Sequence, residues 1–171
     1  KPSLSLVGVG PGDPSLLTIA GINEIKNATL VAYPIAKKGS QSMAAHIAAD
    51  WIQAKKLMPL IFPMVCEKDT LHNAWQKSAD KLIQAFKEGE RVVFISQGDT
   101  SLYSTSSYLS LYIRSRFPEC DFKIIPGINS FSAAAAAAKW PLSLQKESLL
   151  VSPVPDNPKE FEEVLEDSLK K

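Results

Sequence analysis

The sequence predicts an α/β fold: an open, mostly parallel sheet with helices on both faces. Short runs rich in Val, Ile and Leu alternate with longer segments of helical periodicity, which is typical of strand–helix units. Three of the apolar runs lead into loops that contain glycine, where a strand would end. With 171 residues and 45% hydrophobic content, the chain can bury one core of single-domain size.

The apolar runs and the helical patterns follow one another in a regular order. Strands are expected at residues 4–9, 29–33, 57–62, 91–96 and 122–125. Helices are expected at residues 16–25, 41–54, 71–86, around 108–113 and at 133–138. Pro59 and Pro63 place the third strand at an edge of the sheet, because proline cannot donate a ladder hydrogen bond. Asp13 followed by Pro14 indicates a helix N-cap and first turn.

The C-terminal part of the chain reads as a new unit. A strand is expected at residues 147–153 and an amphipathic helix at 159–169. One strand and one helix cannot form a domain by themselves. We therefore expect residues 1–141 to form an N-terminal α/β domain. Residues 142–171 would begin an incomplete C-terminal α/β domain, so that the chain is part of a longer protein.

Composition excludes several classes of function. A net charge of +1 with scattered charges argues against nucleic-acid binding. No apolar run approaches membrane-spanning length, so no membrane partner is expected. Cys66 and Cys120 lie far apart, which indicates reduced, structural thiols in a cytoplasmic protein. His46 and His72 have no ligand-spaced neighbours, so no metal site is expected.

The run at residues 91–96 ends abruptly in Gly98 and Asp99, before a hydroxyl-rich helix start. Ligands bind at the carboxyl ends of parallel strands, which makes Asp99 the leading candidate for a site residue. The same rule brings residues 8–14, 98–105 and 126–132 to one edge of the sheet, where they could line a common cleft.

The first glycine loop, residues 8–14, resembles a dinucleotide-binding turn only superficially. Asp13 places negative charge where a pyrophosphate would bind, and Pro11 and Pro14 remove amide donors. Two interpretations stay open. Gly10, Pro11 and Gly12 form either a wall that faces the substrate or a tight turn without ligand contact.

Three segments carry a resemblance to a known family: VGVGPGDP at residues 7–14, Gly-Asp at 98–99, and IPGINSFSAAA at 125–135. Their order and spacing resemble the tetrapyrrole methylases, S-adenosylmethionine-dependent enzymes that modify corrin and sirohaem precursors. The segments YST at 103–105 and SFS at 130–132 resemble the branch that methylates the C20 meso carbon of precorrin-2 or cobalt-precorrin-2. The chain departs from the family pattern at Thr100, where Pro is usual, and at Asn129, where Thr or Ser is usual.

The resemblance implies a two-domain homodimer that binds S-adenosylmethionine and a tetrapyrrole in a cleft. Carried over by motif, the residues expected to bind the methyl donor are Gly98, Asp99, Ser101, Leu102, Ser130 and Phe131. The residues expected to face the substrate are Gly10, Pro11, Gly12 and Tyr103. For Tyr103, packing in the core is an equal alternative.

The chemistry leaves the role of Asp99 open. After methylation of a meso carbon, a proton must leave the same carbon, and Asp99 could accept it as a catalytic base. Stabilising the donor's cation and capping the next helix are the alternatives. Two other functions also stay open: a related corrin methylase that acts at another carbon, and a non-catalytic ligand-binding or assembly domain.

Overall fold

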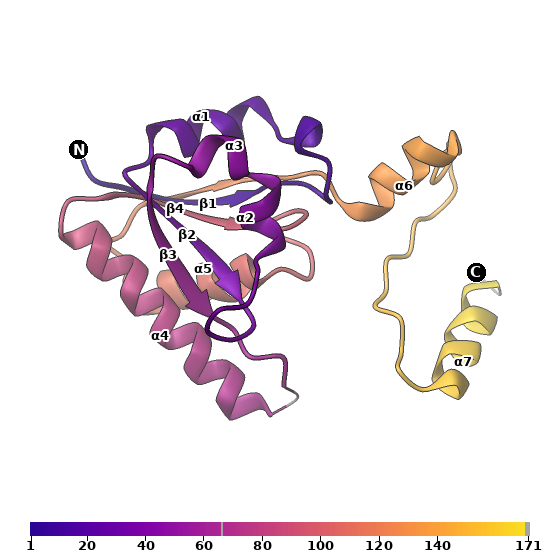
Figure 1. The fold of residues 1–171 in the computed structure, drawn as a ribbon. Coiled ribbons are helices and arrows are strands. Elements are labelled where there is room, and N and C mark those ends of the chain that lie inside the picture. The colour runs from indigo at the N-terminus through magenta and orange to yellow at the C-terminus, as the bar shows by residue number, and fades with distance from the viewer. Residues whose placement is uncertain (66, 170–171) are drawn as a thin grey trace. The chain divides into compact units, whose positions relative to one another are not determined.

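The computed structural model describes residues 1–65 and 67–169 and contains a five-stranded, all-parallel sheet (Figure 1). The strand order is β3-β2-β4-β1-β5. The strands are β1 (Ser3–Gly8), β2 (Leu30–Ile35), β3 (Lys56–Ile61), β4 (Arg91–Ser96) and β5 (Phe122–Ile125). The helices are η1 (Pro14–Leu16), α1 (Ile19–Asn27), α2 (Met43–Ile47), α3 (Ala49–Ile52), α4 (Lys68–Lys87), α5 (Thr105–Arg116), α6 (Ser130–Ala138) and α7 (Pro158–Leu169). The predicted fold class is confirmed.

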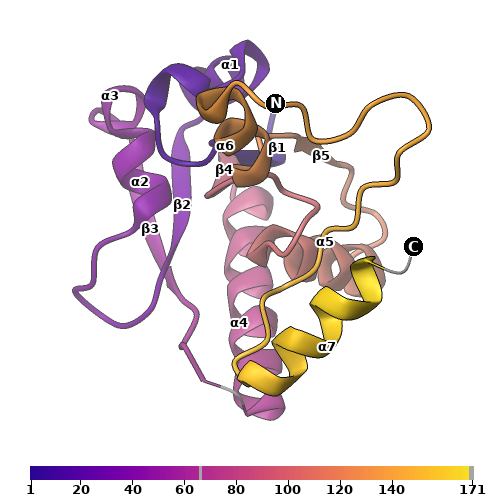
Figure 2. The same ribbon diagram turned by 90° about the vertical axis from the view of Figure 1, so that its right-hand side faces the viewer.

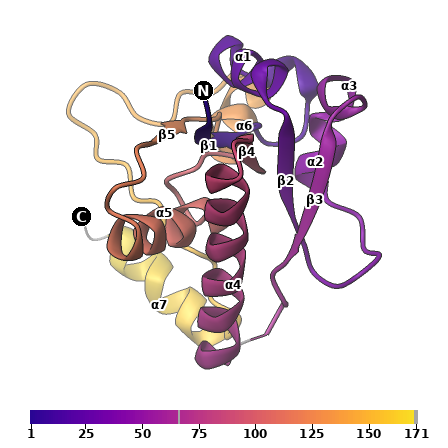
Figure 3. The same cartoon turned by 90° about the vertical axis from the view of Figure 1, so that its left-hand side faces the viewer.

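Helices cover both faces of the sheet. Figure 2 shows α1, α2 and α3 together, and Figure 3 shows α4 and α5 side by side on the opposite face. Alternate residues of each strand point to opposite faces, which divides the core in two. In β4, Phe94 packs with residues of α4 and α5, whereas Ile95 packs with residues of α1, α2 and α3. The central strands are therefore buried on both sides, as their mainly apolar runs predict.

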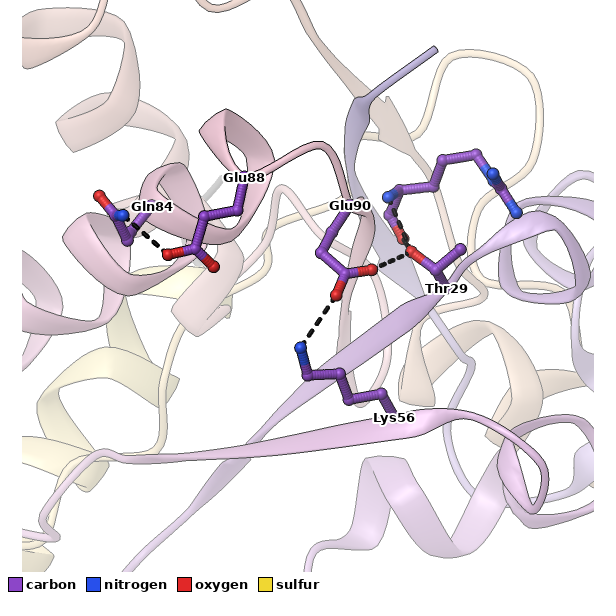
Figure 4. Close-up of polar contacts among 6 residues, drawn as sticks. Thr29, Lys56, Gln84, Glu88 and Glu90 are labelled. Atoms are coloured by element: carbon purple, nitrogen blue, oxygen red, sulfur yellow. Dashed lines mark hydrogen bonds and ion pairs between the residues drawn. The ribbon is translucent and has the colours of Figure 1, made fainter.

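Side-chain hydrogen bonds connect the strands where β2, β3 and β4 begin, at the amino edge of the sheet (Figure 4). The Glu90 carboxylate accepts hydrogen bonds from Thr29 Oγ1 at 2.5 Å and from Lys56 Nζ at 2.9 Å. The Thr29 hydroxyl in turn accepts a hydrogen bond from the backbone amide of Arg91 at 2.9 Å. These contacts join the beginnings of β2, β3 and β4.

Two local predictions are wrong, and a third is correct for a different helix from the one expected. No strand forms at residues 147–153, because no described strand lies alongside to pair with the backbone of this segment. The helix expected at 41–54 is divided at Ala48, whose φ of −90° and ψ of 9° separate α2 from α3. Asp13 is an N-cap and Pro14 stands in the first turn, as predicted, with Asp13 Oδ1 accepting a hydrogen bond from the Ser15 amide at 2.8 Å, but the helix is the short η1. The helix α1 starts only at Ile19. The Oγ1 atom of Thr18 caps α1 by accepting a hydrogen bond from the Gly21 amide at 3.0 Å.

The chain divides into two compact units, residues 1–133 and 134–171. The sheet and all the loops at its carboxyl edge belong to the first unit. The second unit contains α7, which lies at the position expected from its periodicity. None of the described helices is long and apolar enough to cross a membrane.

Candidate functional site

The carboxyl ends of β1, β4 and β5 lie next to one another because β1 pairs with β4 on one side and β5 on the other. Both pairings are parallel, so the three loops that follow these strands leave the sheet at the same edge. The predicted convergence of residues 8–14, 98–105 and 126–132 is thus confirmed.

The first two loops are joined through their main chains at Gly10 and Gly98. The Gly10 amide donates to the Gly98 carbonyl oxygen at 3.2 Å, and the Gly98 amide donates to the Gly10 carbonyl oxygen at 2.7 Å. This pair is antiparallel although β1 and β4 run parallel, because both chains turn after their strands. The φ angles of 83° and 71° lie in the left-handed region, which glycine adopts without a steric penalty.

The third loop lies in close backbone contact with the other two. A Cβ atom on Gly8 would stand 2.6 Å from the Gly98 carbonyl oxygen and 2.7 Å from the Gly127 nitrogen. A Cβ atom on Gly127 would stand 2.8 Å from the carbonyl carbon of Gly8. No side chain fits between these backbones, so glycine is required at both positions.

Asp99 links the second loop to the third. It is 7% exposed, and its Oδ1 accepts a hydrogen bond from the Gly127 amide at 2.9 Å. Its Oδ2 accepts hydrogen bonds from the Ser101 amide at 2.9 Å and from the Ser101 hydroxyl. Burial by itself would raise the pKa of Asp99, but hydrogen bonds from Ser101 and from backbone amides outweigh it and lower the pKa. The carboxylate is therefore ionised at neutral pH.

Buried hydroxyl groups fix the start of α5 beneath this loop. Ser104 caps the helix, with its Oγ accepting from the Ser106 amide at 3.2 Å. The hydroxyls of Ser96 and Ser106 lie 2.8 Å apart, and Ser104 donates to Ser96 at 3.2 Å. The end of β4 is thus connected to the first turn of α5, which limits how the loop between them can move.

The residues predicted to bind the methyl donor come from two of the three loops. Gly98 is half-buried, and no described atom lies within 4 Å of the position that its Cβ would take. Ser101 is exposed and Leu102 half-buried. Ser130, exposed, and Phe131, half-buried, lie in the first turn of α6. An open space over Gly98 with polar groups beside it fits a ligand that approaches the backbone closely.

The residues of the first loop that are predicted to face the substrate differ in their exposure and in their free main-chain groups. Gly10 is buried, and both of its backbone polar groups are used by Gly98. Pro11 and Gly12 are half-buried, and the Pro11 carbonyl oxygen accepts from Gln97 Nε2 at 3.4 Å. This loop can therefore offer surface to a ligand at Pro11 and Gly12, but no free main-chain group at Gly10.

Tyr103 lies at the surface, with 65% of the residue exposed, so the alternative of core packing is wrong. Its φ of 48° is left-handed, which is uncommon for a residue with a Cβ atom. Backbone conformations of this kind concentrate at ligand sites, because surrounding structure must hold them in place. Tyr103 is thus an exposed residue of the loop that follows Gly98 and Asp99, with its backbone in a left-handed conformation.

Sequence reasoning missed a cavity of about 190 Å³ at the carboxyl ends of β2, β3 and β4. Its lining is mostly apolar and consists of Pro34, Ile35, Ala36, Met43, Ala44, Phe62 and Met64. The polar side chains in the lining are those of Gln41, Ser42, Gln97 and Thr105. The rule that located the other loops also applies to β2 and β3, and it could have found this cavity.

The three loops at the carboxyl edge contain no histidine or cysteine. His46 and His72 are both exposed, and Cys120 is a buried thiol whose pKa is raised by burial. Cys66 lies outside the described residues. Within residues 1–65 and 67–169, no group of three or more His, Cys, Asp or Glu side chains is placed to hold a metal ion.

A parallel sheet with three glycine-containing loops meeting at its carboxyl edge is an α/β architecture in which that edge is the usual place for a ligand site. The family model of the Tetrapyrrole (Corrin/Porphyrin) Methylases matches residues 3–170, and the chain belongs to this family. The family predicted from the three motifs is therefore confirmed.

Particular relatives are similar over most of the chain. The probable cobalt-precorrin-2 C(20)-methyltransferase of Methanocaldococcus jannaschii is 37% identical over 147 residues, which cover 86% of this chain and 62% of the relative. The cobalt-precorrin-2 C(20)-methyltransferase of Salmonella typhimurium is 32% identical over 149 residues, with the same coverage. The chain thus spans about 62% of the length of these relatives.

A solved structure shows the same fold. The crystal structure of the methyltransferase CobJ superimposes with a TM-score of 0.66 at 25% identity, covering 99% of this chain and 63% of that one.

Proposed function

We propose that the longer protein to which this chain corresponds transfers a methyl group from S-adenosylmethionine to the C20 meso carbon of precorrin-2 or cobalt-precorrin-2, in cobalamin biosynthesis. The observation that carries the proposal is the meeting of the three motif loops at Gly10, Gly98 and Gly127. The names of the relatives from Methanocaldococcus jannaschii and Salmonella typhimurium support the choice of carbon.

The methyl donor would bind over the second and third loops. Gly98 leaves open space for it, Ser101 and Ser130 offer hydroxyl groups, and the side chains of Leu102 and Phe131 offer apolar surface. S-adenosylmethionine supplies an electrophilic methyl group on a sulfonium centre. The chain's own residues orient this group and exclude water, and orientation alone can supply much of a rate enhancement.

The tetrapyrrole would lie against Pro11, Gly12 and Tyr103 and extend over the cavity at the ends of β2, β3 and β4. The mostly apolar lining of this cavity suits the flat face of a macrocycle, and Gln41 and Gln97 can hydrogen-bond to its carboxylate side chains. A homodimer in the cytoplasm is part of the proposal, on the family resemblance alone.

The proposal can be tested with isotope labelling. The longer protein is incubated with precorrin-2, or with its cobalt complex, and with S-adenosylmethionine carrying a ¹³C-methyl group. We expect a single new ¹³C signal at C20 in the product spectrum. A signal at another carbon would identify a related methylase of different regiochemistry.

Calorimetric titration with S-adenosylhomocysteine complements the labelling experiment. We expect binding by the longer protein, and the 171-residue chain serves as the comparison that shows whether the first unit suffices. Absence of both binding and product would favour a non-catalytic assembly domain.

A further inference from the structure

We propose that Asp99 is a positioning residue: its carboxylate holds the Gly127 amide and thereby sets the conformation of residues 126–129, which lead into Ser130 and Phe131. Its importance for the methyl donor rests on the function proposed above. This role differs from that of a proton acceptor, which would have to face the substrate.

The third loop is not held by strand pairing or by a helix. The ladder between β1 and β5 ends at the pair of Val7 and Ile125, and residues 126–129 form neither helix nor strand. β5 is a short strand at the edge of the sheet, so it is paired on one side only. Beyond Ile125 the hydrogen bond from the Gly127 amide to Asp99 Oδ1, at 2.9 Å, anchors the main chain to the second loop.

The close glycine contacts make this anchor necessary. The backbones of Gly8 and Gly127 are packed so tightly, against each other and against the Gly98 carbonyl oxygen, that no Cβ atom fits on either residue, but van der Waals contact between main chains is weakly directional. A hydrogen bond to an ionised acceptor is stronger and more directional than one between neutral groups. Asp99 therefore selects one arrangement of the third loop among those that avoid steric clashes.

The same geometry makes Asp99 a poor proton acceptor. Three of about four acceptor positions on a carboxylate are occupied, by the Gly127 amide and by the amide and hydroxyl of Ser101. These hydrogen bonds lower the pKa of Asp99, and a weaker base accepts a proton less readily. Asp99 as a whole residue is also only 7% exposed, which limits access by a substrate carbon.

Amide hydrogen exchange of the 171-residue chain tests the role in the absence of any ligand. In Asp99→Ala we expect the Gly127 amide to exchange roughly 10- to 100-fold faster, as for the loss of a hydrogen bond to a charged group. The Ile95 amide in β4 should be unchanged, which separates a local effect from general unfolding. Ser101→Ala is the matched control, because it removes a hydroxyl donor and leaves the Gly127 contact in place. Unchanged exchange at Gly127 in Asp99→Ala would overturn the proposal.

The wild-type chain provides a second readout, the pH dependence of the Gly127 amide signal, for which a variant serves only as the control. The proton shift of the Gly127 amide should move with pH as Asp99 is protonated, with a midpoint below the ordinary Asp value of about 3.9. In Asp99→Asn this transition should be absent. A Gly127 signal in the wild type that is insensitive to Asp99 would likewise contradict the proposal.

Ligand affinity distinguishes positioning from base catalysis. In the longer protein we expect S-adenosylhomocysteine to bind about tenfold more weakly to Asp99→Ala, in keeping with the loss of one charged hydrogen bond. Asp99→Asn should recover part of the loss, because its carboxamide oxygen can still accept from Gly127. Wild-type affinity in both variants, with turnover abolished, would identify a base and overturn the proposal. If the wild type does not bind the ligand, the proposed function fails, and the exchange experiment still decides the role of Asp99.

Discussion

Gly8 and Gly127 are in backbone contact, so that a Cβ atom added to Gly8 would lie 2.7 Å from the Gly127 nitrogen. The same atom would lie 2.6 Å from the Gly98 carbonyl oxygen. Gly8 is the last residue of β1 and is paired in register with Ser96 of β4, so its main chain cannot move aside without breaking the ladder. Both neighbours are themselves main-chain atoms, which cannot rotate away as a side chain would.

Gly8→Ala should therefore destabilise the fold by about 1–3 kcal/mol, the range found for overpacked sites. The measurement is the free energy of unfolding in urea. Ser3→Ala, at the other end of the same strand, is the control and should change stability by less than about 0.5 kcal/mol. Equal stability of Gly8→Ala and the wild type would show that the three loops can separate at low cost.

Tyr103 offers a test of backbone strain. Its φ of 48° costs an L-residue roughly 1–2 kcal/mol, and glycine is free of this cost. Tyr103→Gly should be about 1 kcal/mol more stable than Tyr103→Ala, because both variants lose the ring but only alanine keeps the strain. Thermal unfolding of the two variants side by side measures this difference. If alanine is the more stable, the residue does not keep its left-handed conformation in solution.

Thr18 is the N-cap of α1, which the sequence pattern had assigned to Asp13. Thr18→Ala should cost about 1 kcal/mol, because the Gly21 amide loses its acceptor. Thr18→Ser, which keeps the hydroxyl, should restore most of the stability. Denaturant unfolding compares the three proteins, and a neutral Thr18→Ala would mean that solvent replaces the cap.

The Glu24 carboxylate is expected to make the free energy of unfolding depend on pH in the acid range. Burial would raise its pKa, but hydrogen bonds from Lys123 Nζ at 2.9 Å and from the buried Ser5 hydroxyl at 2.8 Å lower it. The folded pKa lies below the unfolded pKa, so the stabilisation is complete above the unfolded value of about 4.3. It is lost as the pH falls through the lower folded value. Stability measured between pH 7 and pH 3 should therefore decline less steeply in Glu24→Gln than in the wild type; parallel profiles would exclude this contribution.

The five strands could be predicted because each is a short apolar run bounded by turn residues. Pro59 correctly places β3 at an edge, and the rule for parallel sheets correctly brings the ends of β1, β4 and β5 together. The strand expected at residues 147–153 shows the limit of this reasoning. An apolar run indicates that a segment can form a strand, whereas its pairing depends on which backbone lies beside it.

The contacts that build the site could not be predicted in the same way. Asp99 was singled out correctly as a residue at a strand end, but its hydrogen bond to Gly127 spans 28 positions and depends on the conformation of two loops. The close approach of Gly8 to Gly127 likewise has no signature in composition or periodicity. Glycine at a strand end indicates a turn, and only the fold shows which backbone it makes room for.

The pairing of Gly10 with Gly98 uses main-chain atoms alone, and this bears on how such a site can diversify. Hydrogen bonds between amides and carbonyls place no demand on the side chains of neighbouring residues. Side chains next to Gly10 and Gly98 can therefore differ while the main-chain pair keeps the first two loops together, so the scaffold separates the geometry of these loops from the chemistry of their surface. One loop framework can in this way carry surfaces of different selectivity, altered by substitutions that leave the glycine contacts untouched.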